Sequence, residues 1–139
     1  MSFLSNLFGG AEKINDYFAD AVLVYVQTHD PIVRMAALAA AKVANGVQRT
    51  SMVNFLRTVA ANAQEDIGDE DAYYRLNQLA DEICLRDWTV QDARYEKQAL
   101  AKLDWELVRA LDKFDPTVFR RRFPEVFEEA SPENFLNND

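Results

Sequence analysis

The sequence predicts an all-α fold, a single-domain compact bundle of about five to seven helices with a short amphipathic segment at its N-terminus. Apolar residues recur at three- and four-residue intervals along most of the chain, which is the pattern of amphipathic helices. No stretch alternates apolar and polar residues for long enough to indicate a strand, and no glycine turn joins two strand-like runs. The 139 residues, 49% of them hydrophobic, are typical of one domain.

The first two helices meet at a turn marked by Asp30 and Pro31. The first is predicted over residues 11–28, and its apolar stripe comprises Ile14, Tyr17, Phe18, Ala21, Val22 and Tyr25. Asp30 offers a carboxylate cap, and proline suits the first position of a helix because no amide hydrogen is needed there. The second helix, residues 32–45, is rich in alanine, so neighbours can approach it closely. We expect it to be the central and most buried helix.

A third helix is predicted between a glycine and an acidic stretch. Gly46 is expected to close the second helix in the left-handed conformation, and Thr50 or Ser51 to cap the third. The apolar spacing of this helix continues to about Gln64. Residues 65–71 then concentrate acidic side chains around a glycine, which predicts a loop.

The second half of the chain is also predicted to be helical. Helical spacing resumes over residues 73–83, and Thr89 begins a variant of the capping box. One long helix is predicted over residues 90–114. The aspartate–proline pair at 115–116 starts a short apolar helix, which Pro124 interrupts. The domain plan is a flexible amphipathic segment over 1–10, a helical domain over 11–130 and a C-terminal tail over 131–139.

Charge and cysteine content exclude several classes of function. The chain has 15 Lys and Arg against 23 Asp and Glu, a formal net charge of −8, which opposes binding to nucleic acids and to anionic lipid surfaces. The most apolar stretch, residues 35–44, is too short to span a membrane. Cys84 is the single cysteine, so no intramolecular disulfide and no zinc site of the cysteine type is expected, and we place the protein in the cytoplasm.

Three features of the sequence are candidate chemical sites. His29 is the only histidine, and we expect it to take part in structural capping at a helix end rather than to bind a metal. Cys84 lies late in a helix, where a thiolate is disfavoured, and is expected to be a buried or half-buried packing residue. The acids of 65–71 do not follow the spacing of a calcium loop, and helix starts account for the last three of them. We therefore expect no enzyme, no metal and no cofactor.

Arg120, Arg121 and Arg122 form the one dense basic cluster of the sequence. Three glutamates follow within about two helical turns: Glu125, Glu128 and Glu129. Local ion pairing with these acids is the structural interpretation of the cluster. Contact with an anionic partner protein is the alternative.

Two breaks between helices look alike. The stretch from Ala39 to Phe55 passes from helix through a Val-Gln pair to helix, and so does the stretch from Leu79 to Tyr95. This outline resembles the helical module of TerB-like tellurite-resistance proteins over about 60 residues, which implies a metal-associated helical protein. The family has acidic residues at the turn where this chain has Asn45 and Gln48, so no site is carried over.

The favoured function is a non-enzymatic protein-interaction or assembly module, in outline similar to bacterial or bacteriophage accessory proteins. Its partner is expected to be another protein or a second copy of the chain. The candidate partner-binding residues outside the basic cluster are four near the N-terminus and two aromatic anchors in the long helix: Phe3, Leu4, Leu7, Phe8, Tyr95 and Trp105.

The alternative function is an acidic inhibitor or nucleic-acid mimic. In it, the acids of 65–71 and 125–133 occupy and block a basic site on a partner protein. Salt distinguishes the two, because binding through acidic residues weakens steeply as ionic strength rises and apolar docking does not.

The N-terminal segment gives a direct test of apolar docking. Gly9 and Gly10 join it flexibly to the first helix, so it can pack on its own core or on a partner. If residues 1–10 dock on a partner, their deletion leaves helical content unchanged and abolishes assembly. Circular dichroism and sedimentation check this, and loss of the fold would instead assign the segment to the core.

Overall fold

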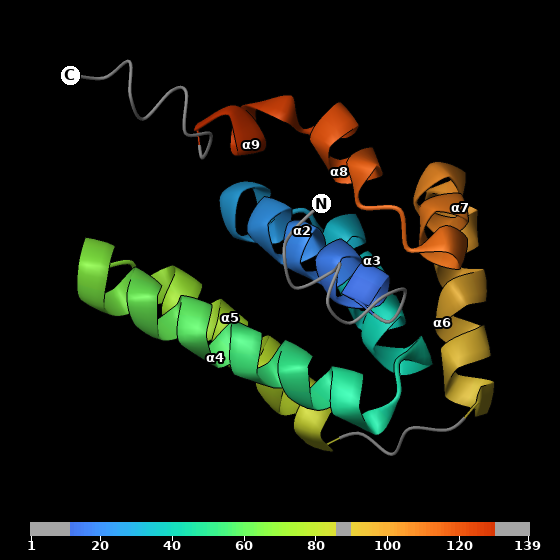
Figure 1. Ribbon diagram of the computed structural model, residues 1–139, viewed down its shortest axis with the longest axis horizontal. Coiled ribbons are helices and arrows are strands. Elements are labelled where there is room, and N and C mark those ends of the chain that lie inside the picture. The colour runs from blue at the N-terminus through green and yellow to red at the C-terminus, as the bar shows by residue number, and fades with distance from the viewer. Residues whose placement is uncertain (1–11, 86–89, 130–139) are drawn as a thin grey trace.

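The computed structural model describes residues 12–85 and 90–129, and these residues form eight helices and no strand (Figure 1). The predicted all-α class is thereby confirmed. Six of the helices have nine residues or more, and two have six. The helices are α2 (Glu12–Thr28), α3 (Pro31–Val43), α4 (Gly46–Ile67), α5 (Glu70–Leu85), α6 (Val90–Leu103), α7 (Trp105–Lys113), α8 (Thr117–Arg122) and α9 (Pro124–Glu129). None of the helices in these ranges is both long and apolar enough to span a bilayer.

Helix α3 lies at the centre of the fold, as expected. It packs against α2, α4, α6 and α7. Five of its alanines are at most 1% exposed: Ala36, Ala37, Ala39, Ala40 and Ala41. Because a methyl group is the whole side chain at each of these positions, neighbouring backbones can come close on several sides of one helix. The small residues of α3 therefore allow four helices to share a single core.

Helix α2 joins the core to the C-terminal helices through Tyr17. The Tyr17 side chain is fully buried, and its hydroxyl donates a hydrogen bond to the carbonyl oxygen of Leu107 in α7 at 3.3 Å. Its ring meets that of Phe119 in α8 edge to face, with centroids 4.9 Å apart. Burial raises the pKa of the Tyr17 phenol, so the hydroxyl stays protonated and remains a donor.

The turn between α2 and α3 agrees with the sequence-based prediction. Oδ1 of Asp30 accepts a hydrogen bond from the backbone N–H of Ile32 at 2.9 Å, and Pro31 is the first residue of α3. The predicted aspartate–proline start is therefore confirmed.

The expected role of Gly46 is wrong. This glycine is the first residue of α4 and has no positive φ, while Asn45 caps the helix instead of Thr50 or Ser51. Oδ1 of Asn45 accepts from the N–H of Gln48, and Oε1 of Gln48 accepts from the N–H of Asn45, each at 2.8 Å. This reciprocal capping box satisfies two amides at the helix start, so the chain needs no left-handed closure there.

The predicted loop over residues 65–71 is much shorter in the structure. Helix α4 continues to Ile67, and only Gly68 and Asp69 separate it from α5. Gly68 is the residue that adopts the left-handed conformation, with φ 65°, and Oδ1 of Asp69 caps α5 by accepting from the N–H of Ala72 at 2.9 Å. The acidic residues are thus parts of two helices joined by a tight turn.

The α4–α5 hairpin forms one side of the molecule (Figure 1), and its two helices share the most extensive contact in the fold. Met52, Leu56 and Ala60 are the buried residues of α4. On the outside, Arg57 of α4 lies 2.8 Å from Asp81 of α5. The closed end of the hairpin, at Gly68, points away from α6 and α7 along the long axis of the molecule (Figure 1).

Lys42 is a buried cation that fixes α6 on α3. Its side chain is 1% exposed, and its Nζ lies 2.7 Å from Oε1 of Glu96 in α6. A buried lysine is costly without a counter-charge, whereas a paired one constrains where the neighbouring helix lies.

Replacement of Glu96 and replacement of Lys42 should therefore lower the free energy of unfolding by different amounts. Glu96→Gln leaves the Lys42 ammonium buried without its counter-charge and is expected to lower the free energy of unfolding by about 3 kcal/mol. Lys42→Met removes the buried charge, and Glu96, whose side chain is 18% exposed against 1% for Lys42, keeps some contact with water, so the expected loss is below about 1.5 kcal/mol. Urea unfolding of both variants measures this, and equal losses would contradict it.

Candidate interaction surface

The α6–α7 corner is the most distinctive feature of the described surface. Helix α6 ends at Leu103 and α7 begins at Trp105, with Asp104 between them in an extended conformation. Oδ1 of Asp104 accepts a hydrogen bond from the backbone N–H of Leu107 at 3.1 Å, which caps α7. One aspartate thus ends one helix and begins the next.

The single long helix predicted over residues 90–114 is therefore wrong. Lys97 of α6 and Asp112 of α7 form an ion pair, although a straight helix would separate these residues by about 22 Å along its axis. The chain must fold back at Asp104 to bring them together. Trp105 and Leu103 consequently flank a sharp corner.

The arginines of α8 hold this corner. Nη1 of Arg122 lies 2.6 Å from Oδ2 of Asp104, and the Asp104 side chain is only 12% exposed. Arg121 pairs with Glu106 in the first turn of α7. The start of α7 is thereby fixed by two arginines from a helix that follows it in the chain.

The third arginine ties α8 to α2. Nε of Arg120 lies 3.2 Å from Oδ2 of Asp20, and its guanidinium carbon is 4.7 Å from the ring centroid of Phe127. Burial raises the pKa of the Asp20 carboxyl, an effect that Arg120 opposes. The ion pairs of the cluster thus connect helices that are distant in sequence. The pairing that we expected was local, with glutamates that follow the cluster in the chain.

The corner exposes large apolar side chains. Leu103 is 56% exposed and Trp105 is 59% exposed, while Tyr95, on the preceding helix, is 70% exposed. These fractions leave both predicted aromatic anchors accessible to a partner. Tryptophan and tyrosine are the side chains that most often dominate the binding energy of protein interfaces.

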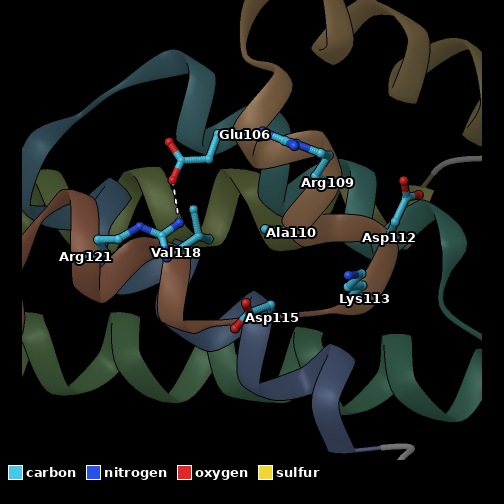
Figure 2. A pocket seen from close by; sticks show the side chains of 8 residues that line it. All are labelled: Glu106, Arg109, Ala110, Asp112, Lys113, Asp115, Val118 and Arg121. Carbon is cyan, nitrogen blue, oxygen red and sulfur yellow. Dashed lines mark hydrogen bonds and ion pairs between the residues drawn. The ribbon is translucent and has the colours of Figure 1, made fainter.

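A shallow hollow of about 430 Å³ lies beside the corner, between α7 and α8 (Figure 2). Its apolar residues are Ala110 and Val118, and the rest of its lining is charged: Glu106, Arg109, Asp112, Lys113, Asp115 and Arg121. The Glu106–Arg121 ion pair closes one side of it (Figure 2). The hollow has room for a side chain of a partner on an apolar base.

The other candidate residues lie elsewhere. His29 follows the last residue of α2 with φ 57°, and its N–H donates to the carbonyl of Tyr25 at 2.7 Å, while Nε2 lies 3.5 Å from Asp71. Cys84 is exposed, so the expectation that it is buried or half-buried is wrong. It belongs to the last turn of α5, where the buried face ends at Ile83.

Side chains of the acidic stretch and of the turn at Asn45 make local structural contacts. Asp69 caps α5, and Asp71 pairs with Arg75 at 2.8 Å. Asn45 and Gln48 cap each other at the start of α4. Within residues 12–85 and 90–129, no group of three His, Cys, Asp or Glu residues has the arrangement of a metal site.

Several predicted elements lie outside the described residues. They are the Thr89 cap, the C-terminal tail and the four apolar N-terminal residues: Phe3, Leu4, Leu7 and Phe8. Their roles stay predictions.

Asp104 and the α7 cations were missed by the sequence reasoning. An aspartate followed two residues later by glutamate is a helix-start signal, and Asp104 with Glu106 has that form. Arg109 and Lys113 lie one turn apart on α7, a spacing that also puts them on one face. Neither signal is part of the apolar periodicity, from which the helices were predicted.

No protein-family model matches this chain, no curated protein is significantly similar to it, and no solved structure matches it significantly.

Two replacements of Asp104 separate its cap from its charge. Asp104→Asn keeps an oxygen acceptor for the Leu107 amide and is expected to lower the free energy of unfolding by less than about 1 kcal/mol. Asp104→Ala removes both contacts and should cost about 2 kcal/mol. Urea unfolding measures the difference, and an alanine variant as stable as the wild type would show that this side chain does not hold the corner.

Proposed function

We propose that the protein is a non-enzymatic interaction or assembly module that docks on another protein or on a second copy through its α6–α7 corner. The observation that carries the proposal is the exposure of Trp105 and Leu103 on either side of Asp104. Burial of exposed apolar side chains at an interface is favourable by roughly 25 cal/mol for each Å² removed from water. A cytoplasmic location, inferred from the single cysteine, belongs to the same proposal.

The contacts beneath the corner support this function. Asp104 is capped into α7 and paired with Arg122, and Arg121 pairs with Glu106. These contacts define the backbone positions of the two exposed side chains before a partner arrives. A surface that is already ordered loses less conformational entropy on binding, so its docking is more favourable.

Tyr95 extends the candidate surface along α6. It is the most exposed aromatic residue among those described. It lies eight residues before Leu103 in the same helix, which corresponds to a rise of about 12 Å. A partner that covered both Tyr95 and the corner would contact α6 over much of its length.

The acidic alternative has an observation of its own. Glu65, Asp66 and Glu70 are exposed near the closed end of the α4–α5 hairpin and form no ion pair with any described residue. Acidic side chains left without counter-charges could occupy a basic site on a partner protein. The two functions use opposite ends of the molecule, so substitutions can distinguish them.

The proposed function predicts a specific loss on replacement of Trp105. Tagged wild-type protein and the Trp105→Ala variant are used to capture partners from a lysate of the source organism, with washes at low and high salt. Truncation of a central tryptophan typically costs 2 kcal/mol or more, about a 30-fold loss of affinity, so the variant should lose a partner that the wild type retains at high salt.

Leu85→Ala is the matched control, because Leu85 is 85% exposed but lies at the end of α5. It should capture the same partner as the wild type. If both variants capture every protein that the wild type does, the corner is not the docking surface. A partner lost at high salt and insensitive to Trp105→Ala would favour the acidic alternative.

A further inference from the structure

The α7 stripe, which comprises Trp105, Arg109 and Lys113, combines an exposed aromatic ring with two cations. These residues follow one another at four-residue intervals and so form one row along the helix. Arg109 and Lys113 are exposed and form no ion pair with any residue in the described ranges. The row therefore offers both apolar area and positive charge to a partner.

The acids around the stripe are already engaged. In the hollow beside it, Glu106 pairs with Arg121, and Asp112 pairs with Lys97. Asp115 accepts two hydrogen bonds from Thr117, which lower the pKa of its carboxyl, and Lys113 contributes a weaker effect in the same direction. A ligand with carboxylates would therefore meet the charge of Arg109, and that of Lys113 reduced by the nearby ionised Asp115.

The hairpin tip, defined as Glu65, Asp66, Ile67 and Glu70, has the opposite character. Ile67 is the last residue of α4 and is 74% exposed. The three acids around it form no ion pair with described residues, and Glu70 accepts one hydrogen bond, from Gln64. The tip therefore presents an exposed apolar side chain surrounded by negative charge.

The tight turn makes the tip convex and well defined. Gly68 closes α4 with φ 65°, and its N–H donates to the carbonyl of Gln64 at 3.1 Å. Asp69 caps α5 immediately afterwards. An isoleucine at such a turn can enter a hollow whose base is Ala110 and Val118, since that hollow measures about 430 Å³.

We propose that the hairpin tip of one copy of this chain docks on the α7 stripe and its hollow in a second copy. This inference rests on the proposed function and identifies the partner as a second copy of the chain. Acids face Arg109 and Lys113, and Ile67 faces the apolar base of the hollow, so charge and hydrophobicity match at the same contact.

The placement of the two surfaces makes the contact intermolecular. The tip and α7 lie toward opposite ends of the long axis (Figure 1), so one copy cannot join its own two surfaces. Two different surfaces that meet give a heterologous contact, which builds an open chain unless the rotation between copies closes it into a ring. In an open chain one tip and one stripe stay free at the ends, so mass should continue to rise with protein concentration.

The net charge sets the conditions under which this contact forms. With a formal net charge of −8, two copies repel each other at low ionic strength. At about 0.15 M salt the Debye length is about 8 Å, which screens the distant charges and leaves the close pairs at the contact. Salt of about 1 M also screens exposed close pairs and should weaken the association.

A charge exchange tests the proposal. The tip variant carries Glu65→Lys, Asp66→Lys and Glu70→Lys, and the stripe variant carries Arg109→Glu and Lys113→Glu. Sedimentation velocity at about 0.15 M salt should show association of the wild type over a wide range of concentration. Each variant alone should associate at least tenfold more weakly, because its tip and stripe then carry the same charge.

The mixture of the two variants is the decisive sample. The positive tip of one variant meets the negative stripe of the other, and the reverse contact is equally matched, so association should recover. Circular dichroism confirms that each variant is folded, and the single pair Asp66→Lys with Arg109→Glu repeats the exchange with a smaller change.

Three results would overturn the proposal: a wild type that stays monomeric, variants that associate as the wild type does, and a mixture of folded variants that does not recover. A mass that stops at two copies would also contradict the open arrangement. If the wild type is monomeric but still captures a partner that Trp105→Ala loses, the inference fails while the proposed function stands.

Discussion

The close approach that the alanines of α3 permit is the constraint on which the rest of the structure depends. Because α3 presents methyl groups on several sides, α2, α4, α6 and α7 can all pack on it within one domain. Lys42 adds direction to this packing, since its buried ammonium must meet Glu96 and so determines where α6 lies. The position of α6 then places the corner at Asp104, and the arginines of α8 fix that corner from outside. The position of the proposed docking surface is thus a consequence of how the core is filled.

Local signals in the sequence were sufficient to predict part of this fold. The stripe of α2, the Asp30–Pro31 start and the buried position of α3 follow from helical periodicity, capping and side-chain size. Periodicity could not show the break at Asp104, because Leu100, Leu103, Leu107 and Leu111 keep three- and four-residue spacing across it. Leu103 nevertheless faces solvent, and Leu107 is buried on a different helix. Apolar spacing alone therefore does not predict that the helix axis changes direction at Asp104.

The candidate surface could be predicted only in part, for a related reason. Tyr95 and Trp105 stood out as aromatic residues in a polar helix, and both are exposed. The pairing of the α8 arginines with Asp20, Asp104 and Glu106 depends on contacts between distant parts of the chain, which spacing along the sequence does not reveal. Once these arginines are neutralised, the exposed charge that is left over differs between the two ends of the molecule. That difference, rather than the net charge, underlies the proposed contact between copies.

The accessibility of Trp105 is the most direct measure of docking at the α7 stripe. The chain has two tryptophans, so Trp88→Phe leaves Trp105 as the only one. Quenching of its fluorescence by acrylamide reports how much of the ring meets solvent. At low protein concentration the ring should be readily quenched, in keeping with its 59% exposure. If the hairpin tip docks on the stripe, quenching falls and the emission shifts to shorter wavelength as concentration rises at about 0.15 M salt. Equal quenching at every concentration, in a sample that sedimentation shows to be associated, would contradict this docking.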